Sequence, residues 1–379
     1  MRDKLKDKMT EVSDYIFQHP ELSKHEEQSS RALADFLEQE GFTVKWELAG
    51  FRTAFVAEWG SGQPIIGFLA EYDALPGLAQ EPVSRHCPKE GPGHGCGHNL
   101  LGTACAGAAV ALKERMEREQ ISGTVRVYGC PAEEIVIGKI RMNEQGVFDE
   151  LSATVTWHPF DRNRVSYDIW QAQDIKNYKF YGIAAHAARF PEKGRSALDA
   201  AELMNVGVNY LREHVADDVR MHYTYTNTDG PANMVPPFAS TNYFIRSCLW
   251  KKTKDASERV DNCAKGAAMC TGTTVEINQK DEITKDVRND KKLVSYFRNN
   301  MEFIGEPYIE RDLSQGIGST DVGNVTHEIP AIQAYIGLKE GVATHTKEFA
   351  VAAGGEEGKR ALTTAVQLLA MSGLDVLCE

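Results

Sequence analysis

Residues 65–76 read Ile65-Ile66-Gly67-Phe68-Leu69-Ala70-Glu71-Tyr72-Asp73-Ala74-Leu75-Pro76. The first six residues are an apolar run, which is typical of a strand buried on both faces of a sheet. Two carboxylates, Glu71 and Asp73, follow directly. Because ligand sites in open α/β sheets lie at the carboxyl ends of the strands, this pattern predicts an α/β domain with a polar site at that edge.

Further candidate ligands follow other predicted elements. The strand predicted over 123–129 runs into Glu133 and Glu134, and the strand predicted over 153–157 runs into His158. A glycine-flanked turn, Gly95-Cys96-Gly97-His98-Asn99, precedes a buried helix predicted over 99–118. A metal-ligand cluster beside a free carboxylate can activate water, so the sequence predicts a metal-dependent hydrolase.

The order of predicted elements indicates two domains, one inserted into the other. The first domain begins with helices over 4–18 and 26–41 and strands over 43–48 and 53–59. A βαββαβ pattern follows, with strands over 176–183, 219–227, 241–250 and 272–279 and helices over 195–213 and 255–269. It predicts a four-stranded antiparallel sheet with two helices on one face. The expected organisation is a mixed-sheet catalytic domain over 1–175 and 285–379, interrupted by an α+β domain over 176–284.

Composition excludes several classes of protein. The chain has 379 residues, of which 42% are hydrophobic and 25% charged, as in an ordinary globular protein. Its formal net charge of −12 argues against a nucleic-acid partner. No stretch approaches the roughly 20 apolar residues of a membrane helix, and the charged start is unlike a signal peptide. Eight cysteines lack CxxC spacing. We therefore expect a cytoplasmic protein with free thiols, among which Cys96 is a candidate soft metal ligand.

Five side chains form the candidate ligand set: Cys96, His98, Glu134, His158 and His345. One tetrahedral zinc takes four ligands, so two divalent ions with a bridging ligand and a bridging hydroxide fit better. The thiolate favours zinc, whereas imidazole and carboxylate admit zinc or manganese. Glu133 is then the general base, although spacing alone does not decide which of the two adjacent glutamates binds metal.

The chain resembles a known family through several motifs: Glu71 to Pro76, Gly95 to Ala104, Pro131 to Glu134, Trp157 to Pro159, Ala184 to Ala187, Gly194 to Ala200, Asn233 to Pro236, Gly318 to Gly323 and His345. They are similar to those of the dinuclear metallo-aminoacylases and carboxypeptidases, over nearly the whole length. That family includes glutamate carboxypeptidases and auxin-conjugate amidohydrolases, and the likeness is greatest to its aminobenzoyl-glutamate hydrolase branch. The resemblance implies a catalytic domain of the zinc-peptidase type.

The resemblance also implies roles in the metal centre. Glu133 would be the general base, Glu134 a ligand, Cys96 the bridging ligand and Asp73 the residue that orients the centre. Many relatives carry a histidine two residues before that aspartate, and His98 would supply the missing nitrogen here.

The auxin-conjugate branch reads Cys-Gly-His-Asp where this chain has Asn99. That departure weakens an auxin-type substrate and leaves the hydrolase prediction intact.

For the inserted domain the resemblance implies dimerisation and substrate binding. His186 would reach the partner's active site and stabilise the oxyanion. Asn233 and Arg246 would hold the substrate's carboxylate or carbonyl, although a surface salt bridge is an alternative role for Arg246. Gly318 and Ser319 would belong to a glycine-rich wall that ends at Asp321. The expected assembly is a homodimer.

Three functions remain open from the sequence. The first is hydrolysis of an amide that joins an acyl, aroyl or aminoacyl group to an amino acid with a free carboxylate; aminobenzoyl-glutamate and small dipeptides are candidate substrates. The second keeps the site but displaces an amino group from an activated aromatic carbon. The third is a non-catalytic homologous subunit, which would be marked by loss of Glu133 or of ligands that are all retained here.

Overall fold

The computed structural model describes residues 3–166, 171–228, 230–310 and 318–379. The chain divides into two compact units. Unit 1 consists of Met1–Asp168, Val287–Gly316 and Thr320–Glu379, and unit 2 consists of Ile169–Asp286 and Ile317–Ser319. The segment predicted as the insert, 176–284, lies within unit 2.

Unit 1 is built on a mixed sheet. Among the described residues it has six strands in the order β1-β2-β4-β3-β5-β10. Their bounds are Thr43–Trp46 (β1), Phe55–Ser61 (β2), Ile65–Glu71 (β3), Gly123–Cys130 (β4), Ala153–Phe160 (β5) and Ala331–Gly337 (β10). β3 pairs in parallel with β4 and β5, and β5 with β10, whereas β2 runs antiparallel to β1 and β4. The predicted mixed-sheet α/β class is confirmed.

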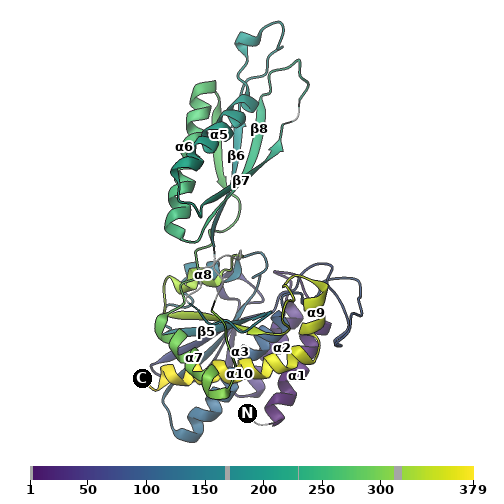
Figure 1. Cartoon of the computed structure of the whole chain (residues 1–379), viewed down its shortest axis with the longest axis vertical. Helices are drawn as coiled ribbons and strands as arrows, with labels where there is room; N and C mark the ends of the chain where they lie inside the picture. Colours follow the sequence, from purple (N-terminus) through teal and green to yellow (C-terminus); the bar gives the residue numbers. More distant parts are fainter. Residues whose placement is uncertain (1–2, 167–170, 229, 311–317) are drawn as a thin grey trace. The chain divides into compact units, whose positions relative to one another are not determined.

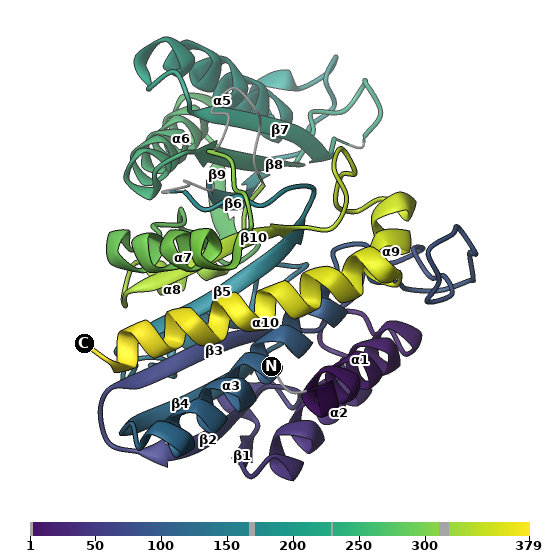
Figure 2. The same cartoon turned by 60° about the horizontal axis from the view of Figure 1, so that its bottom comes forward.

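Two long helices, α3 (His98–Glu119) and α10 (Glu356–Leu377), pack against this sheet, and α1 (Asp3–Gln18) packs against α3. Figure 2 shows α10 lying alongside α3, and both contribute to one apolar core with the sheet. All seven residues of β3 are buried, which explains its continuous apolar run. Gly102 lets α3 approach β3 closely, because a Cβ there would lie 2.4 Å from the carbonyl oxygen of Glu71.

The other α-helices of unit 1 are α2 (Glu27–Gln39), α4 (Gly138–Glu144), α7 (Lys291–Ile304), α8 (Val322–Thr326) and α9 (Lys347–Ala353). The short helices α4, α8 and α9 were not among the predicted elements. They have 7, 5 and 7 residues, too few for an apolar period of 3.6 to repeat recognisably.

Unit 2 contains β6 (Ala172–Tyr181), α5 (Ala197–Leu211), β7 (Arg220–Asn227), β8 (Phe238–Ser247), α6 (Trp250–Thr271) and β9 (Thr274–Gln279). Its strands lie in the order β7-β8-β6-β9 and pair antiparallel throughout. Both helices lie on the same side of the sheet (Figure 1) and share one apolar core with it. The predicted βαββαβ arrangement is confirmed.

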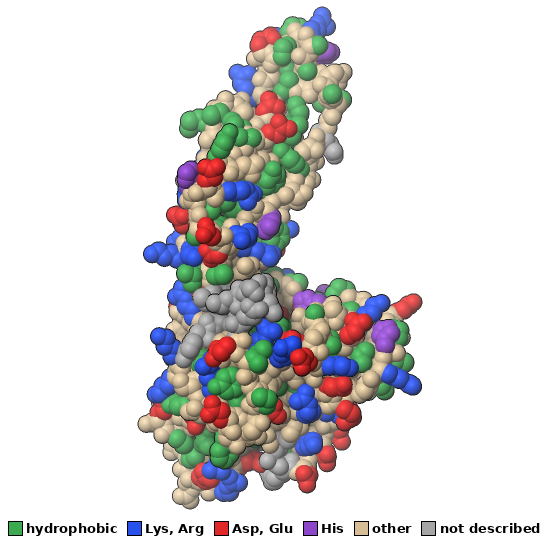
Figure 3. Space-filling view, viewed as in Figure 1, with side chains coloured by type: hydrophobic (Ala, Val, Ile, Leu, Met, Phe, Trp, Pro, Cys, Tyr) green, Lys and Arg blue, Asp and Glu red, His purple; other side chains and the backbone are tan. Residues whose placement is uncertain are grey.

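The surface carries charges of both signs. On the face drawn in Figure 3, lysine and arginine side chains are interspersed with aspartate and glutamate, without an extended patch of one sign. Within the described part of the chain, every helix is too short or too polar to cross a membrane.

Candidate metal centre

The candidate site lies at the carboxyl ends of three neighbouring strands of unit 1. Glu71 is the last residue of β3, and Glu133 and Glu134 follow β4. His158 was expected just after a strand but lies inside one, because β5 continues to Phe160 through its pairing with β10. The site therefore forms where parallel-strand ends bring distant residues together.

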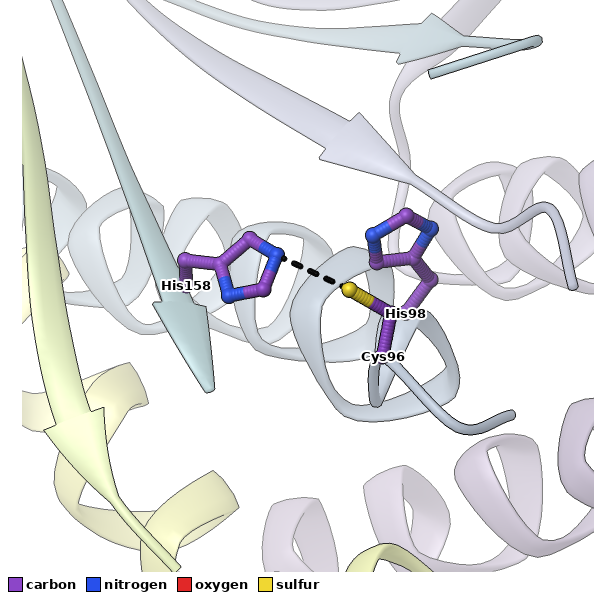
Figure 4. A group of neighbouring side chains, drawn as sticks. All are labelled: Cys96, His98 and His158. Atoms are coloured by element: carbon purple, nitrogen blue, oxygen red, sulfur yellow. Dashed lines mark hydrogen bonds between the residues drawn. The ribbon is translucent and has the colours of Figure 1, made fainter. Parts of the chain in front are cut away.

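Cys96 lies between two histidines. Its Sγ is 3.4 Å from Nε2 of His158 and 3.3 Å from Nε2 of His345. Figure 4 shows the first of these contacts, with His98 beside it. Glu134 approaches from the other side, with Oε2 3.5 Å from Nε2 of His345.

These side chains form two donor groups that share one atom. The first is Cys96, His98 and His158, and the second is Cys96, Glu134 and His345. Within each group the potential ligand atoms lie within 4.8 Å of one another. Because the cysteine sulfur belongs to both groups, the arrangement fits two cations bridged by a thiolate.

His98 is oriented by Asp73. The histidine begins α3, and its Nδ1 lies 2.9 Å from Oδ1 and 3.1 Å from the backbone oxygen of Asp73. A hydrogen bond from Nδ1 to a carboxylate fixes the tautomer in which Nε2 is free to bind metal. Burial alone would raise the pKa of the Asp73 carboxyl, but the hydrogen bond and charge of His98, together with hydrogen bonds from the backbone of Glu134 and from Ser23, lower it.

Two buried polar atoms in the site support the presence of a cation. Among the residues that the structure describes, Nε2 of His98 and Oε1 of Glu134 have no hydrogen-bond partner, although Nε2 lies 3.3 Å from Oε2 of Glu71. Unpaired buried polar atoms are destabilising, and a bound divalent ion would satisfy them. Thiolate, imidazole and carboxylate together suit zinc or manganese.

Burial favours the neutral form of two of the three candidate ligand histidines, His158 and His345. For His98, burial is outweighed by the neighbouring Cys96, Asp73 and Glu71, which raise its pKa. The pKa of His158 falls to about 4, first because of burial and then because of the positive charge of His98. The same two causes lower the pKa of His345. A neutral imidazole is the form that binds metal, so both rings are ready to act as ligands.

Glu133 is a further buried carboxylate close to the proposed ligands. Its Oε2 lies 3.9 Å from Nε2 of His98. Burial and then the charges of Glu71 and Asp321 raise the pKa of Glu133 well above its usual range. The neighbouring Glu134 has a pKa raised to about 7, mainly by burial.

The loop that carries these two glutamates is held by hydrogen bonds on both sides of Glu133. The backbone N–H of Glu134 donates to Oδ2 of Asp73 at 2.9 Å, and that of Ala132 donates to Oε1 of Glu26 at 2.9 Å. Ala132 has a left-handed φ of 60°. Glu26 was not predicted to belong to the site, because its partner is a backbone group more than a hundred positions along the chain, a contact that leaves no mark on the sequence pattern.

A buried ion cluster beside the site was also missed. Nζ of Lys139 lies 2.9 Å from Oε1 of Glu71 and 2.5 Å from Oδ1 of Asp321, and all three side chains are fully buried. Lysine is rarely buried, so sequence reasoning assigns it to the surface. Asp321, expected at the end of a pocket wall, pairs with Lys139 in this cluster.

The remaining predicted residues lie in unit 2. His186 and Asn233 are exposed, and His186 forms an isolated β-bridge with Met234. Ser319 donates from Oγ to the backbone oxygen of Gln171 at 2.9 Å, and Gly318 is exposed.

Arg246, the other predicted residue of unit 2, lies on β8. Its guanidinium lies 5.2 Å from the ring centroid of Phe244. Among the described residues it has no carboxylate partner, and its buried Nε makes no hydrogen bond. The surface salt bridge considered from the sequence is therefore not formed with a described residue.

Comparisons with known proteins find relatives in one peptidase family. The model of peptidase family M20/M25/M40 matches residues 67–368. The chain is 42% identical over 294 residues to one of the subunits of p-aminobenzoyl-glutamate hydrolase from Escherichia coli (strain K12), a match that covers 76% of this chain and 59% of that protein. It is 31% identical over 389 residues to the Xaa-Arg dipeptidase of Mus musculus, covering 99% and 87%. A Bacillus subtilis structure described as a dinuclear metal-binding peptidase of the M20 family superposes with a TM-score of 0.78 at 22% identity, over 99% of both chains.

Proposed function

Because the chain belongs to peptidase family M20/M25/M40, we propose that it is a metal-dependent amidohydrolase acting on N-acyl, N-aroyl or aminoacyl amino acids. The observation that carries the proposal is the sulfur of Cys96, shared by two donor groups, with the carboxylate of Glu133 beside them. This combination can supply both the water activation and the proton transfer that amide hydrolysis needs.

Cys96, His98, Glu134, His158 and His345 would hold two divalent ions. When bound, such ions lower the pKa of water toward neutrality and polarise a carbonyl. We propose zinc or manganese, because the thiolate favours zinc while the other donors accept either.

Glu133 is the proposed general base. It would take the proton from water and give it to the departing nitrogen, because its carboxylate faces the site. Asp73 is the orienting residue, since one of its oxygens accepts from His98 and the other from the backbone of Glu134.

The proposed substrate joins an acyl group to an amino acid that keeps its free carboxylate. The relatives named above act on p-aminobenzoyl-glutamate and on Xaa-Arg dipeptides, and both compounds have this form. The guanidinium of Arg246, whose buried Nε makes no hydrogen bond with a described residue, suits a carboxylate. His186 is proposed to stabilise the oxyanion, and Asn233, Gly318 and Ser319 are proposed to contact the substrate.

We further propose a homodimer located in the cytoplasm. Unit 2 exposes large apolar side chains on α5, among them Val206 and Tyr210, which a second copy could cover. All eight cysteines lie in the described residues and are free thiols, which fits a reducing compartment.

The test combines metal analysis with substrate hydrolysis. Purified wild type and Glu133→Gln would be compared for metal content and for release of amino acid from p-aminobenzoyl-glutamate, N-benzoylglycine and several dipeptides. We expect about two ions per chain in both proteins and turnover in wild type only, with kcat reduced by roughly 10²–10⁴-fold in the variant. Glu117→Gln, on the solvent side of α3, is the matched control and should retain full activity.

Each contrary outcome identifies what is wrong. An active Glu133→Gln variant would remove Glu133 as the base, and fewer than two ions after reconstitution would remove the dinuclear centre. Two bound ions without turnover of any substrate would favour a chain that needs a different partner chain, a possibility raised because the Escherichia coli relative is named as one subunit of its enzyme.

A further inference from the structure

A lysine with no assigned role lies fully buried next to the candidate site. Lys139 is in the first turn of α4, and its ammonium is held between Glu71 and Asp321. The backbone N–H of Lys139 also donates to Oδ2 of Asp321 at 2.8 Å. Two carboxylates around one ammonium give the cluster a net negative charge in the interior. Burying these charges costs free energy, which is offset only when the ion-pair distances are kept short.

The cluster ties together three elements that border the site. Glu71 ends β3, Lys139 belongs to α4, and Asp321 directly precedes α8. Because each element contributes one charged group, moving any of them would break an ion pair in a fully buried place.

The start of α4 is continuous with the loop that carries Glu133. The backbone N–H of Val136 donates to the oxygen of Glu133 at 2.7 Å, and that of Ile137 donates to the oxygen of Ala132 at 3.2 Å. At Gly138 a Cβ would lie 1.7 Å from the oxygen of Pro131, so helix and loop are in direct contact. Fixing Lys139 therefore fixes the loop.

Glu71 connects the cluster to the proposed ligands. Its Oε1 faces Lys139, while its Oε2 lies 3.3 Å from Nε2 of His98. The direction of this carboxylate beside His98 is consequently set by the ammonium on its other oxygen.

We propose that Lys139 is a positioning residue. It fixes the positions of the Glu133–Glu134 loop and of the Glu71 carboxylate relative to His98. The proposal rests on the proposed function. Lys139 would contact neither the substrate nor the reacting atoms; it acts through Glu71 and through the loop. Substitution should therefore affect metal affinity and kcat together, while leaving KM nearly unchanged.

The test is Lys139→Met, which keeps the length of the side chain and removes its charge. Residues that support metal ligands typically change affinity or activity by 10–100-fold. We expect metal affinity, measured by competition with a chelator, to fall by about this factor, and kcat of the fully loaded enzyme to fall similarly. KM should stay within about threefold, since no substrate contact is removed.

Lys176→Met is the matched control. Lys176 is also largely buried between two carboxylates, 2.9 Å from Asp261 and 3.6 Å from Asp174, but it lies in unit 2. Its substitution should leave metal affinity unchanged.

A second variant allows for misfolding. If Lys139→Met does not fold, Lys139→Met/Asp321→Asn removes one uncompensated carboxylate, and the amide oxygen can still accept from the backbone of residue 139. We expect this variant to fold and still to show weak metal binding and low kcat. A folded variant of either kind with wild-type metal affinity and kcat would overturn the proposal.

The metal measurement separates this proposal from the proposed function. If wild type hydrolyses no substrate, the proposed function fails, whereas the change in metal affinity still decides the role of Lys139.

Discussion

We expect the sulfur of Cys96 to influence which metals the candidate centre prefers. It lies 3.3–3.4 Å from two histidine nitrogens, and a thiolate there is the softest donor of the set. Cys96→Asp would replace it with a harder donor of the same charge.

We expect Cys96→Asp to bind two ions still, with the ratio of zinc to manganese affinity lowered on the order of tenfold. Equilibrium dialysis against buffered zinc and manganese would measure this ratio. Cys105→Ser is the control, because Cys105 is buried in α3, the helix that follows Cys96, and donates to the backbone oxygen of Leu69. An unchanged ratio in Cys96→Asp would show that the sulfur does not bind the metals.

Glu26 is expected to make the metal-free protein less stable as pH rises. Its pKa is raised from 4.5 to about 7, first by burial and then by the charge of Asp73. A carboxyl whose pKa is higher in the folded state binds its proton more tightly when folded. Its contribution to stability is therefore greatest below pH 4.5 and is lost as pH rises to about 7, a difference of about 3 kcal/mol.

Glu26→Gln should remove this dependence while keeping an acceptor for the N–H of Ala132. Relative to wild type, the free energy of unfolding of the variant should increase by up to about 3 kcal/mol between pH 5 and pH 8. Urea unfolding of metal-free proteins at several pH values would measure it, with the exposed Glu38→Gln on α2 as control. A difference independent of pH would contradict the assigned pKa.

At the scale of single residues, the sequence could predict Cys96 and His98 because glycines flank them and both side chains occupy one short turn. It could not predict Glu26 or Lys139. Their partners, Ala132 and the pair Glu71 and Asp321, are distant in the sequence, and only the folded sheet brings them into contact.

At the scale of elements, the contact between α3 and β3 sets the position of His98. Gly102 lies one turn after His98, and a Cβ there would meet the carbonyl oxygen of Glu71 at 2.4 Å. Gly102→Ala should force the helix away from the strand and lower the free energy of unfolding by about 1–3 kcal/mol.

The same substitution should weaken metal binding, because the displaced helix carries His98 at its start. Thermal unfolding and chelator competition would measure the two effects. Gly266→Ala in α6 is the matched control: no atom lies within 4 Å of its added Cβ, so a gain of roughly 0.5–1 kcal/mol is expected. Equal behaviour of the two variants would refute close packing at Gly102.

Helices and strands could be predicted where their apolar or alternating sequence pattern extends over many residues. The continuous apolar run of β3 and the buried helix α3 follow from composition, and the four strands of unit 2 follow from alternation between turns. The end of β5 was misplaced, because its last residues include His158 and Pro159, which the pattern assigns to a loop. Pairing with β10, which is distant in the sequence, extends the strand.

At the scale of the whole molecule, the two units have separate apolar cores. The core around α3 and α10 and the core around α5 and α6 have no residue in common. The chain leaves and re-enters unit 1 at neighbouring points, since Nδ2 of Asn289 donates to the backbone oxygen of Ser166 at 3.0 Å. A short linker between these points would therefore close unit 1.

Replacing residues 169–286 by a short Gly-Ser linker should yield a folded unit 1 that still binds two divalent ions, because the proposed ligands all belong to unit 1. The same protein should hydrolyse amides far more slowly, since it lacks His186 and Arg246; loss of an oxyanion-stabilising group alone costs roughly 10²–10³-fold. Metal analysis and kcat/KM for p-aminobenzoyl-glutamate would measure both properties.

His186→Gln and Arg246→Gln in the full chain are the comparison, and each should retain both ions. A shortened protein with full activity would exclude unit 2 from the active site, and one that binds no metal would show that the centre does not form without it.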